Sequence, residues 1–177
     1  DGANNSNNVG VYLADGATVR ATGSGAVSVT GTGATASGNA NHGLVIDNGS
    51  RVMSTSGAIT LNGTAPAGIG DLVDGISIQG ASTIVVSSGG NVTLSGNSGF
   101  HPNSAGVDVR DHAVVTTGGS GQIVINATGG EGLYMQNSGT LLAAGGGISI
   151  AATGLKAGDG FGAVELRDGA GVVTTAG

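Results

Sequence analysis

A short apolar pattern recurs along the chain. Each copy begins with a small residue and continues with two apolar residues on either side of a third residue, as in Gly10-Val11-Tyr12-Leu13. The first apolar residues follow one another at spacings of 33, 32, 31, 26 and 31: Val11, Leu44, Ile76, Val107, Leu133 and Val164. Alternation of this kind is typical of a strand with one buried face. The pattern predicts a repeat that opens with a short strand.

Two further apolar features follow inside each unit. One apolar residue comes eight positions after the first in every copy, and this set predicts a second strand: Val19, Val52, Ile84, Val115, Leu141 and Val172. An alternating pair comes fifteen to eighteen positions after the first and predicts a third strand: Val27/Val29, Ile59/Leu61, Val92/Leu94, Ile123/Ile125 and Ile148/Ile150.

The corner between the first and second strands has the same chemistry in each unit. Its first residue is always Asp, Asn or Gly: Asp15, Asn48, Gly80, Asp111, Asn137 and Asp168. These residue types adopt a left-handed backbone most readily. The sequence therefore predicts the same tight turn at each of these corners.

Stacking is the arrangement that can stabilise such short strands. Isolated strands of a few residues are not stable, whereas stacked units pair each strand with its equivalent about 4.8 Å away. We predict an all-β, right-handed parallel β-helix solenoid with three short strands per coil and about five and a half coils of 26–33 residues. We expect residues 1–177 to be one segment of a longer solenoid without its caps.

Length variation is confined to the connection between the third strand and the next first strand. These connections are expected at 30–42, 62–74, 95–105, 126–131 and 151–162. Because they fall at one corner of the unit, they should line one edge of the solenoid. Such an edge is often the binding face of a repeat protein.

The composition of the chain argues against several classes of site and partner. The chain has 38 Gly, no Cys, 9% charged residues and a net charge of −6. The lack of Cys excludes disulfides and thiolate metal sites, and the acidic balance argues against a nucleic-acid partner. No apolar run reaches the ~18–20 residues of a membrane-spanning helix, so we expect a chain that does not span a membrane.

Metal and cofactor chemistry is not predicted. The histidines His42, His101 and His112 fall at different places in the unit and do not converge, whereas a zinc site needs three or four converging ligands. The aspartates of the corners are explained by the turn itself. We therefore predict no cofactor, no metal site and no catalytic residue.

One family has repeats like these. Residues 57–64 (GAITLNGT) and 25–33 (GAVSVTGTG) resemble repeats of filamentous-haemagglutinin-like large exoproteins, the secreted partners of two-partner secretion. The resemblance covers essentially the whole chain. It implies a secreted protein at the outer face of a Gram-negative bacterium that acts as an adhesin, a toxin stalk or a haem-acquisition protein. Autotransporter passenger domains are similar and remain an alternative.

The expected function is that of a structural or adhesive rod. Its edge loops would bind surfaces, host or matrix glycans, or partner chains placed end to end or laterally. A second hypothesis is a polysaccharide-active β-helix enzyme, a lyase or hydrolase, with its site on the outer face at Asp108, Tyr134 and Glu165. The two acids would lie about 10 Å apart, which is wide for a glycosidase pair. The simpler interpretation is a polar face on which Arg110 and Arg167 form ion pairs.

A less polar file runs along the outside of the second strands. It predicts a possible interaction stripe at Met53, Val85, Leu142 and Val173. Exposed apolar stripes can mark an interface, although β-branched residues are also ordinary on an outer strand face.

Overall fold

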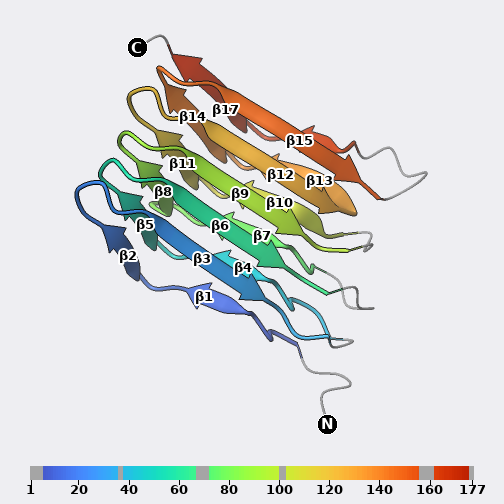
Figure 1. Cartoon of the computed structure of the whole chain (residues 1–177). Coiled ribbons are helices and arrows are strands. Elements are labelled where there is room, and N and C mark those ends of the chain that lie inside the picture. The colour runs from blue at the N-terminus through green and yellow to red at the C-terminus, as the bar shows by residue number, and fades with distance from the viewer. Residues whose placement is uncertain (1–5, 36–37, 67–71, 100–102, 156–161, 176–177) are drawn as a thin grey trace.

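The coils stack one on another in a parallel solenoid (Figure 1). The computed structural model describes residues 6–35, 38–66, 72–99, 103–155 and 162–175. Within these ranges the chain has 17 strands and no helix. The strands form three parallel sheets, with three strands per coil and about five turns. The predicted fold class is confirmed.

The first strands of the coils make up sheet A. Its order follows the sequence: β1 (Val11–Leu13), β4 (Leu44–Ile46), β7 (Ile76–Gln79), β10 (Ala105–Arg110), β13 (Glu131–Gln136) and β16 (Val164–Leu166). Equivalent residues pair across each interface, so Val11 pairs with Leu44 and Leu44 with Ile76. The predicted stacking of like positions therefore holds in this sheet.

The second and third strands make up sheets B and C. Sheet B contains β2 (Thr18–Ala21), β5 (Arg51–Ser54), β8 (Ile84–Ser87), β11 (Val114–Thr117), β14 (Thr140–Ala144) and β17 (Gly171–Thr175). Sheet C contains β3 (Val27–Thr32), β6 (Ile59–Thr64), β9 (Val92–Asn97), β12 (Ile123–Gly129) and β15 (Ile148–Gly154).

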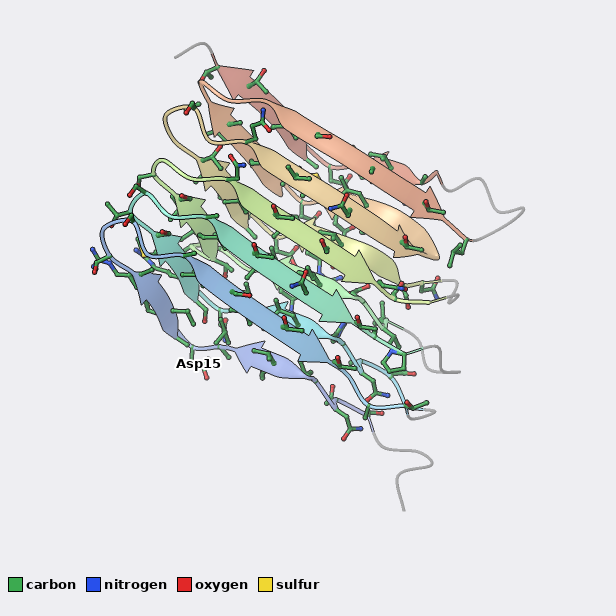
Figure 2. The ribbon with its side chains drawn as sticks, in the orientation of Figure 1. Asp15 is labelled. Carbon is green, nitrogen blue, oxygen red and sulfur yellow. The ribbon has the colours of Figure 1, made fainter. Side chains whose placement is uncertain are left out.

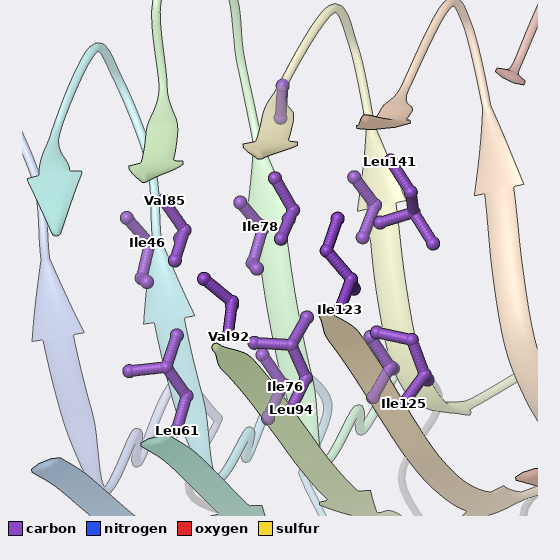
Figure 3. Close-up of a cluster of buried hydrophobic side chains, with 14 of the residues drawn as sticks. Ile46, Leu61, Ile76, Ile78, Val85, Val92, Leu94, Ile123, Ile125 and Leu141 are labelled. Carbon is purple, nitrogen blue, oxygen red and sulfur yellow. The ribbon is translucent and has the colours of Figure 1, made fainter. Parts of the chain in front are cut away.

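The three sheets enclose one apolar column. Figure 3 shows aliphatic side chains from all three sheets pointing toward one another, among them Ile78 from sheet A, Val85 from sheet B and Leu94 from sheet C. Each of these side chains is fully buried. Burial of a large aliphatic side chain contributes about 1.5–3 kcal/mol, so the column supplies the stability that no single strand possesses.

The register of the third coil differs from the prediction. Val85, not Ile84, pairs with Val52 and lies in the interior. The corner before β8 carries one residue more than the other corners, because Ile78 and Val85 are separated by six residues whereas Ile46 and Val52 are separated by five. The constant offset of eight is therefore wrong for this coil, and Val85 does not point outward.

The corners between sheets A and B turn as predicted. Each predicted residue has positive φ, from 47° at Asn137 to 91° at Gly80. Figure 2 labels Asp15, which lies at the first corner, between β1 and β2. Side chains also join neighbouring corners, because Asn48 Nδ2 donates to Asp15 Oδ1 at 2.9 Å. The turn residues thus link coils as well as reverse the chain.

Glycine forms the corner between sheets B and C. A Cβ placed on Gly90 would collide with the carbonyl oxygen of Gly57, and a Cβ on Gly57 would collide with that of Gly25. The backbones of successive coils are therefore in direct contact at this corner. Only a residue without a side chain allows that approach.

The strands of sheet C run further than predicted. Residues 126–129 belong to β12 and β13 begins at Glu131, so the connection expected at 126–131 is almost entirely strand. Asn126 pairs with Ser95 and Ala127 with Gly96, which continues the ladder. The other four predicted connections lie partly outside the described residues, and their role as display loops stays a prediction.

Candidate functional site on the outer face of sheet A

The outer face of sheet A carries a single file of side chains in register. The file consists of Tyr12, Val45, Ser77, Asp108, Tyr134 and Glu165. An exposed polar face was expected, yet Val45, Ser77 and Asp108 are at most 4% exposed. The segments that precede the A strands lie against this face, since Leu72 and Asn103 line the same cleft as Asp108.

Hydrogen bonds between neighbouring coils hold these segments in place. The N–H of Val73 donates to Ser104 Oγ at 2.9 Å, and the N–H of Asp74 donates to His42 Nδ1 at 3.0 Å. Asp74 Oδ1 in turn accepts from the N–H of Ala105 at 2.8 Å. We call these segments, which comprise His42 and residues 72–74 and 103–104, the covering layer. Hydrogen bonds therefore join the covering layer from coil to coil, as they join the strands beneath it.

A cleft of about 280 Å³ opens between this layer and the fourth to sixth coils. We call it the sheet A cleft. Six charged or aromatic side chains define it: Asp74, Asp108, Arg110, Glu131, Tyr134 and Arg167. Leu72, which is 50% exposed, lies at its edge. The cleft therefore brings together three of the 11 acidic residues and two of the five basic residues of the chain.

The arginines of the cleft are paired. Arg110 Nε lies 3.2 Å from Asp108 Oδ2, and its guanidinium donates to Gln79 Oε1 from Nε at 2.8 Å and from Nη2 at 2.6 Å. Arg167 pairs with Glu165. The predicted ion pairs of the outer face are confirmed, and they neutralise part of the acidic charge.

Burial raises the pKa of Asp108 well above its usual range. Desolvation is the main cause, and the nearby Asp74 carboxylate raises the pKa further, while Arg110 lowers it. The pKa of Tyr134 is raised as well, mainly by burial. Its hydroxyl donates to Gln136 Oε1 at 2.7 Å, so the ring is held by its polar end.

Buried oxygens without a hydrogen-bond partner concentrate on this file. Among the described residues four such side-chain atoms occur, and three belong to the file: Ser77 Oγ, Asp108 Oδ1 and Glu165 Oε2. The fourth belongs to Ser50. An unsatisfied buried polar atom costs about 1–3 kcal/mol. The outer face of sheet A is therefore the part of the described fold with the most unused bonding capacity.

The predicted polysaccharide site is brought together in part. Asp108 and Tyr134 line the cleft, and Glu165 pairs with Tyr134 on the next strand without lining it. Sequence reasoning missed Asp74 and Glu131. Their position in the repeat could have indicated them. Each stands directly before the glycine that opens the repeat unit, as His42 does in the second coil.

A second cleft, of about 530 Å³, lies over the first three coils. Its lining includes Tyr12, His42 and Asp47, and Tyr12 Oη donates to Asp47 Oδ2 at 3.4 Å. Tyr12 is 58% exposed. It thus occupies the same file as Tyr134 but lies in a separate, larger cleft, which makes it a useful control residue.

The predicted interaction stripe needs one correction. Met53, Leu142 and Val173 do share an outward file of sheet B, but its member in the third coil is Val86. Val85 is fully buried, because the longer corner shifts the strand by one position. The corrected stripe is therefore Met53, Val86, Leu142 and Val173, and its role as an interface stays a prediction.

Two classes of site have no support in the described part of the chain. There, no three His, Asp or Glu side chains are grouped so that they could hold a metal ion. Nor do the described residues include a helix with the length and apolar character needed to cross a membrane. His42 bonds to Asp74 and His112 is an exposed corner residue, while His101 lies outside the described residues.

No protein-family model matches this chain, and no curated protein or solved structure matches it either. A comparison therefore supplies neither a family nor a relative with a known ligand. What the chain does has to be inferred from its own residues, above all from those of the sheet A cleft.

Proposed function

We propose that this chain is a structural and adhesive rod. The single observation that carries the proposal is the pairing of a continuous apolar column with a covered, cleft-bearing face on one side. The column holds the stacked coils together as one elongated body. The cleft-bearing face gives that body a place at which surfaces, glycans or partner chains can bind.

The rod would belong to a secreted exoprotein of the filamentous-haemagglutinin-like kind, at the outer face of a Gram-negative bacterium. The repeats at 25–33 and 57–64 support this, since both stretches contain a sheet C strand of the solenoid. An autotransporter passenger domain is the alternative, with the same location and display role. Many weak contacts along repeated units would then combine into firm attachment.

Site-directed shielding tests the adhesive role. The chain has no Cys, so single cysteines can be introduced and coupled to polyethylene glycol. A polymer at Asn103→Cys would shield the sheet A cleft, whereas one at Ser28→Cys would cover the outer face of sheet C. Both native residues are exposed.

Binding of the labelled chains to surfaces coated with host or matrix glycans is then compared. We expect the Asn103→Cys conjugate to lose attachment and the Ser28→Cys conjugate to keep it. Failure of the unlabelled chain to attach to any coated surface would overturn the adhesive role. Equal attachment of both conjugates would show that the sheet A side does not carry it.

A polysaccharide-active enzyme is the second candidate. The arrangement in its favour is that Asp108 and Tyr134 line the same cleft, where burial raises the pKa of the Asp108 carboxyl, as is common for general acids in enzymes. Incubation with pectin, alginate and host glycans tests it. New reducing ends or unsaturated products that disappear in Asp108→Asn would favour the enzyme over the rod, and intact polysaccharide would favour the rod.

A further inference from the structure

The sheet A cleft has the size of a small-ligand site. At about 280 Å³ it lies just below the roughly 300–1,000 Å³ of pockets that hold drug-sized molecules. It fits one compact ring better than an extended chain. Side chains from the β10, β13 and β16 end of sheet A meet there with Asp74 and Leu72 from the covering layer.

The unpartnered oxygens indicate what such a ligand must supply. Asp108 is 2% exposed, lines the cleft, and has no partner for Oδ1 among the described residues. Ser77 Oγ, on the neighbouring strand, also has no partner among these residues, but Ser77 does not line the cleft. A ligand hydroxyl can donate to a carboxylate and can also accept from a protonated carboxyl. A ligand rich in hydroxyl groups therefore matches either protonation state of Asp108.

The charges of the cleft disfavour an anionic ligand. A carboxylated or sulfated group would face Asp74 and Glu131. Repulsion between like charges at close range weakens binding. The two arginines already pair with Asp108 and Glu165. No strong excess of positive charge is left to compensate that repulsion.

A cationic ligand is also a poor match. Asp74 Oδ1 accepts from the Ala105 N–H, and Asp74 Oδ2 lies 3.3 Å from His42 Nδ1. Asp108 Oδ2 faces Arg110. An ammonium group would compete with these existing partners for the same carboxylates, so charge alone would bring little affinity.

Tyr134 supplies an apolar surface for the part of the ligand that carries no hydroxyl groups. Its ring lies between Asp108 and Glu165 in the file and lines the cleft, while its hydroxyl is held by Gln136. An aromatic face next to polar side chains packs well against a ligand with one apolar side and several polar groups. A pyranose ring has this character, because its C–H groups gather on one face.

We infer that the sheet A cleft is a binding site for one ring of an uncharged saccharide, with Tyr134 as the packing surface and Asp108 as the hydrogen-bonding partner. The inference rests on the proposed adhesive function and names the ligand class of its binding face. The second cleft, around Tyr12, is not part of this site.

Binding measurements with a panel of probes test the assignment. The probes are neutral oligosaccharides (cello-, malto-, galacto- and N-acetylglucosamine series), oligogalacturonate, heparin oligosaccharide and spermine. We expect at least one neutral series to bind and the charged probes to bind more weakly. Tyr134→Ala and Asp108→Ala should each weaken neutral binding about tenfold or more, whereas Tyr134→Phe should retain most of it.

Tyr12→Ala is the matched control, since it removes a tyrosine from the same file outside the site. Asp108→Asn provides a second variant of the key carboxyl if Asp108→Ala fails to fold, and urea denaturation checks each variant. Absence of binding to the neutral panel, tighter binding of a charged probe, or neutral binding insensitive to the Tyr134 and Asp108 changes would overturn the inference. Attachment to coated surfaces that persists in Tyr134→Ala would leave the adhesive role standing and remove only this site.

Discussion

Oδ1 of Asp74 accepts a hydrogen bond from the backbone N–H of Ala105 at 2.8 Å, which joins the covering layer of one coil to the first residue of β10 in the next. Both residues are buried. The side chain thus adds a hydrogen bond at the start of β10, where the backbone N–H of Gly75 also donates to the carbonyl oxygen of Ala105 at 3.0 Å.

Removal of that carboxylate should destabilise the fold. Asp74→Ala leaves the buried N–H of Ala105 without its acceptor, and we expect a loss of about 1–3 kcal/mol in the free energy of unfolding. Asp74→Asn keeps an oxygen at the same position and should lose less. Urea denaturation of the two variants measures the difference, and equal losses would contradict this role.

The register of the third coil gives a second prediction. Val85→Ser places a hydroxyl in the apolar column and removes a fully buried side chain, so we expect a loss of at least about 2 kcal/mol. Val86→Ser changes an outward position on the same strand and should cost less than about 1 kcal/mol. A larger effect at Val86 than at Val85 in thermal or urea unfolding would mean that the strand has the opposite register.

The glycine contacts between sheets B and C predict a sharp contrast between two glycines of this corner, Gly90 in the third coil and Gly147 in the fifth. Gly90→Ala forces a methyl group into the Gly57 carbonyl and should cost about 1–3 kcal/mol or more. Gly147→Ala meets no atom within 4 Å and has no positive φ, so we expect no loss or a gain of a few tenths of a kcal/mol. Midpoints of urea unfolding for the two variants would test this, and similar values would argue against backbone contact at the corner.

Asp108 predicts a pH dependence of stability. Its pKa is raised in the folded chain, whereas the unfolded chain releases this proton near pH 3.9. The folded chain therefore binds more protons above about pH 4, and stability falls as the pH rises toward the raised pKa. Asp108→Asn should remove this loss.

Urea denaturation of both proteins between about pH 4 and about pH 8 measures the effect. The stability of Asp108→Asn relative to the parent chain should increase with pH and level off above the raised pKa. A difference that does not change with pH, or that changes in the opposite direction, would contradict the assignment.

The outward stripe of sheet B predicts lateral association. Serine at Met53, Val86 and Leu142 removes its apolar side chains without touching the column. We expect weaker association in sedimentation experiments at high concentration, with an unchanged circular dichroism spectrum. Association equal to that of the parent chain would leave the stripe as an ordinary strand face.

The alternating residues of sheets A and C predicted their strands and register, because a period of two decides which face is buried wherever apolar and polar residues alternate. Ile84, Val85 and Val86 do not alternate, so the pattern could not reveal the extra corner residue. The file of Asp108, Tyr134 and Glu165 followed from the same period. The contributions of Asp74 and Glu131 did not, since irregular connections have no period that places them over the sheet.

In-register stacking also has a mechanical consequence. Hydrogen bonds between equivalent strands run along the axis of the stack, and each coil bonds only to the coils beside it. A pulling force along that axis would detach one coil at a time. Each detached coil of 26–33 residues releases roughly 90–115 Å of chain, so a tether built this way would yield in steps and absorb load before it breaks.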